Sequence, residues 1–189
     1  MNPKVANFLS IIGHPLLTVP LVIEFVLLQN FQFSEIILES SLLFGIIILT
    51  VANNLYKLKK KSYSNFDVSN QNQRKNFYLY LLIVLIIFLL INNFLIENSK
   101  ISVGLWVSFS MVVCFAIINY FIKSSLHTGV NLFLTCILFS QNTGLAFIFL
   151  VLTFLVAYSR LILKKHSLKE IISGGIIGLI FGLIYLILN

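Results

Sequence analysis

Residues 143–188, TGLAFIFLVLTFLVAYSRLILKKHSLKEIISGGIIGLIFGLIYLIL, decide the fold class of this chain. They contain two apolar runs, 143–163 and 171–188, and a helix that crosses a membrane needs roughly 20 such residues. Because the runs are continuously apolar rather than alternating, they favour helices over the strands of a membrane barrel. The stretch therefore predicts two membrane helices joined by a short polar connection.

The rest of the chain repeats this pattern. Of the 189 residues, 59% are hydrophobic and only 10% are charged, whereas globular domains carry roughly 25% charged residues. We expect an all-α, polytopic transmembrane bundle of about six to seven helices, forming a single domain over residues 1–189. Within it we distinguish N-terminal helices (1–56) from a core (57–188). The hydrophobic segments lie at roughly 6–28, 35–56, 77–96, 101–122, 126–141, 143–164 and 168–188.

Three local features qualify this layout. Gly13-His14-Pro15 and Pro20 interrupt the first segment, which we expect to be kinked or only partly spanning. We interpret His14 as structural or interfacial, because no acidic or basic partner lies near it in the sequence. On the last segment small residues recur every four positions and predict close helix packing, at Gly174, Gly178 and Gly182.

Composition also limits the partners. The net charge of +7 is interleaved with membrane segments, so anionic lipid or a phosphorylated substrate is a better candidate partner than nucleic acid. Cys114 and Cys136 fall inside apolar runs and read as buried hydrophobic residues. We expect no metal and no cofactor, since neither a carboxylate cluster nor ligand-spaced His and Cys residues occur. No obligate protein partner is evident.

The polar connection between the last two segments carries candidate chemistry. If a helix begins near residue 166, His166 and Glu170 lie on one face, where the carboxylate can orient the imidazole. An oriented imidazole beside cations such as Arg160 is a candidate nucleophile next to an anion site. Ser159-Arg160-x5-His166-x3-Glu170 resembles the third signature of the type 2 phosphatidic acid phosphatase superfamily, in which the last residue is usually Asp.

Two other stretches resemble the remaining signatures of that superfamily. Ser125 and His127 match the serine and histidine of Pro-Ser-Gly-His, the second signature. Arg74 stands at the arginine of the first signature, Lys-x6-Arg-Pro, where Asp67 and Lys75 replace the lysine and the proline. The resemblance covers roughly residues 57–188.

The resemblance implies a membrane-embedded, metal-independent lipid-phosphate phosphatase. His166 would form a phosphohistidine, Glu170 would fix its tautomer, and His127 would protonate the leaving group. Candidate substrates are phosphatidic acid, phosphatidylglycerol phosphate and a polyprenyl diphosphate. The substrate's phosphate oxygens would be held by Arg74, Lys123, Ser125 and Arg160.

Two alternatives stay open. The incomplete first signature favours a catalytically degenerate membrane protein of the same fold that binds anionic lipid. A small transporter or channel is the other alternative, although we find neither an inverted repeat nor paired broken helices in the sequence.

Topology adds an independent expectation. Two predicted spans separate Arg74 from His127, and two more separate His127 from His166, so all three motifs should lie on one side of the membrane. Most lysines and arginines fall on that side, and only Lys100 falls on the other. The resemblance implies a multi-pass protein of the bacterial inner membrane, and the positive-inside rule then predicts that its motifs lie at the cytoplasmic face. Many bacterial members of the resembled superfamily act on the outer face, which stays an alternative.

Overall fold

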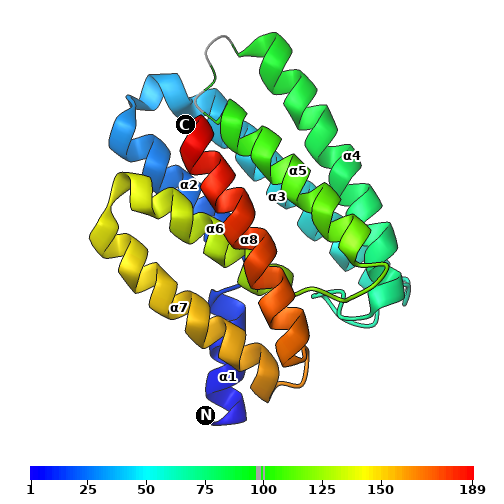
Figure 1. Ribbon diagram of the computed structural model, residues 1–189. Coiled ribbons are helices and arrows are strands. Elements are labelled where there is room, and N and C mark those ends of the chain that lie inside the picture. The colour runs from blue at the N-terminus through cyan, green and yellow to red at the C-terminus, as the bar shows by residue number, and fades with distance from the viewer. Residues whose placement is uncertain (97–98, 100) are drawn as a thin grey trace. The chain divides into compact units, whose positions relative to one another are not determined.

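The computed structural model (Figure 1) describes residues 1–96, 99 and 101–189, without the side chains of residues 33–35 and 95. Every regular element in these residues is a helix, which confirms the all-α prediction. The described helices are α1 (Pro3–Ile12), α2 (Pro15–Asn30), α3 (Phe33–Lys59), α4 (Gln71–Leu95), α5 (Ser102–Ile118), α6 (Leu126–Gln141), α7 (Thr143–Ile162) and α8 (Leu168–Leu188).

Helix length and hydropathy indicate an integral membrane protein. Among the described residues, four helices (α3, α4, α7 and α8) are long and apolar enough to cross a membrane, or five spans if α1 and α2 form one bent span. Helices α5 and α6 have 17 and 16 residues. At 1.5 Å per residue they are about 24–26 Å long, shorter than a hydrocarbon core of about 30 Å. The described residues form eight helices instead of the six to seven expected, and the number of membrane crossings and the common side of the motifs stay predictions. Lys100 lies outside the described residues.

The first hydrophobic segment is bent, as its Gly-His-Pro sequence predicted. Helix α1 ends at Ile12, α2 begins at Pro15, and the two helices meet at 45°. Pro15 suits the first position of a helix because its missing N–H would have no partner there. A side chain at Gly13 would collide with Val156 of α7. The bend thus depends on a residue small enough to let the chain approach α7.

The chain forms two compact units. The first unit comprises Met1–Val26 and Ile122–Asn189, and the second comprises Leu27–Phe121. In the second unit α4 packs against both α3 and α5. The predicted division between the N-terminal helices (1–56) and the core (57–188) differs from the unit boundaries, which lie at Val26/Leu27 and Phe121/Ile122. The single-domain organisation stays a prediction.

Helix α6 is central to the first unit. It packs against both α7 and α8, while α1 packs against α7. Helices α6 and α7 run antiparallel and are joined at Asn142 (Figure 1), whose side chain accepts a hydrogen bond from the N–H of Leu145 and caps α7. Most of α6 is buried, from His127 to Leu138. This burial explains how a helix too short to be an obvious membrane span is held in place.

The glycines of α8 allow a very close approach to α6. A Cβ at Gly174 or Gly178 would collide with the backbone of Ser125 or Gly129, respectively. A Cβ at Gly182 would lie 2.5 Å from the Sγ of Cys136. The close packing predicted from the glycine spacing is therefore confirmed, and it brings the first turns of α6 and α8 together.

Candidate functional site

Helix α7 ends in a defined cap just before His166. The N–H of Lys165 donates to the carbonyl of Arg160 at 3.0 Å, and the N–H of Lys164 donates to that of Leu161 at 2.9 Å. These two bonds form a Schellman motif, which places the residue after the cap in the left-handed region. That residue is Lys164, with φ 53°. A lysine thus occupies a position that glycine usually fills.

Replacing Lys164 by glycine is expected to stabilise the protein. A left-handed backbone costs an L-residue roughly 1 kcal/mol, a cost that glycine lacks. We expect Lys164→Gly to raise the free energy of unfolding by about 0.5–1 kcal/mol, measured by denaturation in detergent. Lys165→Gly is the control, because Lys165 lies outside the left-handed region. Equal stability of the two variants would contradict this account.

Helix α8 begins with a capping box one residue after His166. The hydroxyl of Ser167 accepts a hydrogen bond from the N–H of Glu170, and the carboxylate of Glu170 accepts one from the N–H of Ser167 at 3.0 Å. Two orphan N–H groups of the helix end are satisfied in this way. His166 is therefore fixed between two capping motifs, which restrict its backbone on both sides.

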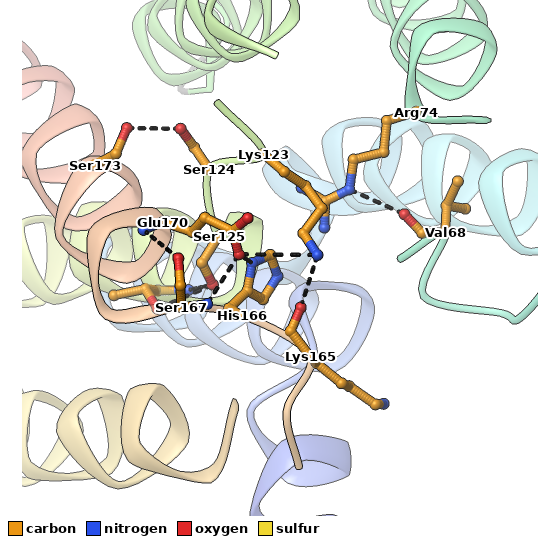
Figure 2. Close-up of polar contacts among 11 residues, drawn as sticks. Val68, Arg74, Lys123, Ser124, Ser125, Lys165, His166, Ser167, Glu170 and Ser173 are labelled. Atoms are coloured by element: carbon orange, nitrogen blue, oxygen red, sulfur yellow. Dashed lines mark hydrogen bonds and ion pairs between the residues drawn. The ribbon is translucent and has the colours of Figure 1, made fainter. Parts of the chain in front are cut away.

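The same carboxylate orients the His166 ring. Glu170 Oε2 lies 3.0 Å from His166 Nδ1 (Figure 2). An ionised carboxylate can only accept a hydrogen bond, so Nδ1 carries the proton and a neutral ring has its lone pair on Nε2. The ring is fully buried, whereas the Glu170 side chain is 19% exposed. This is the arrangement expected of an oriented imidazole nucleophile.

Lys123 lies beside this pair. Its Nζ is 3.8 Å from Glu170 Oε2 and donates to the carbonyl of Lys165 at 3.0 Å (Figure 2). The ammonium therefore lies next to the carboxylate that orients the His166 ring. It also places a positive charge near the imidazole, where a phosphate could bind.

Ser125 joins α6 to this cluster. Its N–H donates to the carbonyl of Glu170 at 2.9 Å. Its hydroxyl caps α6 by accepting from the N–H of Thr128 at 3.4 Å, and it also accepts from the Thr128 hydroxyl at 3.1 Å. A second cross-link between α6 and α8 is the hydrogen bond of 2.7 Å between the hydroxyls of Ser124 and Ser173 (Figure 2). The structure thus gives the predicted phosphate ligand Ser125 a capping role.

His127 occupies the first turn of α6 and is buried. Its ring lies edge-on to that of His14, with centroids 4.8 Å apart and planes at 81°. The sequence predicts a structural or interfacial role for His14, since no acidic or basic partner lies near it along the chain. The signal that could have identified it was its place in the Gly13-His14-Pro15 break, where a buried polar side chain can meet another helix.

Arg160 is fully buried in the last turn of α7. Its Nη1 donates to the hydroxyl of Ser10 in α1 at 2.7 Å. Ser10 was not identified from the sequence, where it is one polar residue in an apolar run. The hydroxyl of Ser159 donates to the carbonyl of Val156 at 2.6 Å, a bond within its own helix.

Arg74 belongs to the second unit, in the first turn of α4. Its Nε donates to the carbonyl of Val68 at 2.9 Å, and both residues are buried. Val68 has φ 47°, an unusual backbone conformation for a β-branched residue. Lys75, at the proline position of the resembled signature, places its Nζ 4.9 Å from the ring centroid of Tyr120. The loop before α4 thus holds Arg74 in a fixed orientation within this unit.

No protein-family model matches the sequence, and no curated protein or solved structure shows significant similarity to it. The motif residues and their geometry are therefore the basis on which a function can be inferred.

Proposed function

We propose that this protein is a membrane-embedded, metal-independent lipid-phosphate phosphatase that acts through a phosphohistidine. The observation that carries the proposal is the hydrogen bond of 3.0 Å between His166 Nδ1 and Glu170, with Lys123 3.8 Å from the same carboxylate. A fixed tautomer whose Nε2 carries the lone pair, beside a positive charge, suits attack on a phosphate. The resemblance to the type 2 phosphatidic acid phosphatases supports the same reaction.

The reaction takes place in two steps. His166 Nε2 attacks phosphorus, the bond to the lipid oxygen breaks, and His127 gives its proton to that oxygen. A water molecule then attacks the phosphohistidine, its proton passes to His127, and inorganic phosphate leaves. Glu170 remains ionised and stabilises the charge that develops on His166. Lys123 and Arg160, which belong to the same unit as the two histidines, bind the non-bridging oxygens, where most of the transition-state charge lies.

The burial of the histidines restricts how a substrate arrives. The His166 ring is fully buried and His127 is nearly so. A phosphate therefore reaches Nε2 only after the side chains that cover it move. A lipid whose tail lies between helices carries its head group to the membrane interface, where the lysines before α8 attract it.

A second candidate is a degenerate member of the same fold that binds anionic lipid without hydrolysis. Several predicted site residues have structural roles that do not require catalysis. Glu170 completes a capping box, Ser125 caps α6, and Arg160 donates to Ser10. Lys164 and Lys169 are exposed near the start of α8 and could attract anionic head groups. This candidate predicts binding of anionic vesicles without phosphate release.

Phosphate release by the purified protein in detergent distinguishes the two candidates. Phosphatidic acid, phosphatidylglycerol phosphate and undecaprenyl diphosphate are offered separately, with and without EDTA. We expect release from at least one of them at the same rate in EDTA, since no step passes through a metal. Release that EDTA abolishes would contradict the metal-independent mechanism. No release from any of the three by a folded protein that binds anionic vesicles would favour the degenerate member.

A further inference from the structure

The break between α1 and α2 turns three residues toward the catalytic part of the first unit. Ser10, Gly13 and His14 follow the i, i+3, i+4 spacing of one helix face. Ser10 contacts Arg160, the carbonyl of Gly13 accepts a hydrogen bond from α6, and His14 contacts His127. The N-terminal segment therefore contacts two of the predicted site residues directly, although it lies outside the stretch that carries the signatures.

Two contacts of the His14 side chain are of different kinds. Its Nδ1 accepts a hydrogen bond from the N–H of Leu16 at 3.2 Å, which is the contact of a helix N-cap at the start of α2. Its ring packs edge-on with the ring of His127, at 4.8 Å and 81°. The first contact is local and structural. The second joins the two separate stretches of the chain that form the first unit.

Asn131 fixes the backbone beside both histidines. Its side-chain amide donates to the carbonyl of Gly13 at 2.8 Å and to the carbonyl of His127 at 2.7 Å. Asn131 is itself fully buried. One donor group thus sets the separation between the break in the N-terminal helices and the first turn of α6. These two hydrogen bonds hold the backbones of Gly13 and His127 close together, next to the ring contact between His14 and His127.

We propose that His14 is a positioning residue for His127. This inference rests on the proposed function, in which His127 protonates the leaving oxygen. A general acid must hold its proton within hydrogen-bond reach of that oxygen, so its ring orientation matters as much as its charge. A perpendicular ring at 4.8 Å restricts rotation of the His127 imidazole. His14 acts through His127 and need not touch the substrate.

Two substitutions separate the two contacts of His14. His14→Asn keeps a side-chain acceptor for the N-cap but removes the ring, whereas His14→Phe keeps a ring but removes the acceptor. We expect His14→Asn to lower kcat by about ten- to a hundredfold, with KM nearly unchanged and thermal stability preserved. We expect His14→Phe to retain most of the kcat and to unfold at a lower temperature than His14→Asn. Parental kcat in His14→Asn, or equal loss of kcat in both variants, would overturn the proposal.

A spectroscopic readout makes the test independent of hydrolysis. The chain has three histidines, so a protein labelled with ¹⁵N in its imidazoles gives three sets of ring signals, and His127→Gln assigns one set. The His127 signals should shift or broaden in His14→Asn and stay near their parental positions in His14→Phe. Unchanged His127 signals in His14→Asn would overturn the positioning role. Shifted signals in a protein that hydrolyses none of the lipids would support the contact and overturn the phosphatase proposal instead.

Discussion

Replacing His166 by alanine is expected to lower phosphate release by about 10³-fold or more. The substitution removes the nucleophile, and the electrostatic environment that remains cannot form a covalent intermediate. His166 lies between two capping motifs formed by other residues, so the variant should still fold. The measurement is kcat in detergent micelles, together with a thermal unfolding curve for each variant.

Glu170→Gln is the matched companion variant. A glutamine at this position can complete the capping box as glutamate does, but it lacks the charge that stabilises a developing imidazolium. We expect stability close to that of the parent and a loss of about 10- to 100-fold in kcat. Lys169→Gln alters an exposed charge on the neighbouring residue and should change little. Full activity in His166→Ala would contradict the mechanism, and full activity in Glu170→Gln would limit Glu170 to capping.

Gly178→Ala is expected to destabilise the protein by about 2–3 kcal/mol. The added methyl group would collide with the backbone of Gly129 in α6. A main chain cannot rotate away as a side chain can, so α8 and α6 must separate over several residues. The loss is measured as a lower free energy of unfolding by denaturant in detergent.

Gly175→Ala provides the control on the same helix. Its new methyl group would lie 3.8 Å from the Cγ2 of Thr128, an ordinary van der Waals distance. Alanine also has the higher helix propensity, so we expect a change within about 0.5 kcal/mol or a slight gain. Comparable losses for the two variants would show that α8 does not pack against α6 through Gly178.

Local patterns predicted the features that depend on neighbouring residues. Continuous apolar runs indicated the helices, the spacing of Gly174, Gly178 and Gly182 indicated a packing stripe, and Gly13-His14-Pro15 indicated a bend. The four-residue spacing of His166 and Glu170 predicted that they share a face. The two side chains are in contact in the structure, as that spacing predicted. However, His166 precedes the helix, because α8 begins at Leu168 and Ser167 is its N-cap.

Contacts between distant parts of the chain could not be predicted in this way. Arg160 and Ser10 are 150 positions apart, and nothing in the sequence around either residue indicates that the other is its partner. The contact of His14 with His127 depends on the bend between α1 and α2 and on Asn131, which donates to the carbonyls of Gly13 and His127. Such pairs are set by tertiary packing, which hydrophobic periodicity does not encode. The sequence likewise contains no sign that Val68 adopts a left-handed backbone beside Arg74.

Trapping the covalent intermediate tests the central claim most directly. The protein is mixed with the lipid that it hydrolyses fastest, quenched in alkali to preserve phosphohistidine, and digested for mass spectrometry, with His166→Ala treated in parallel. We predict one phosphoryl group on the peptide that contains His166 and none on the corresponding peptide of the variant. Phosphate release without a label on His166, or a label on another residue, would contradict the assignment of His166 as the nucleophile.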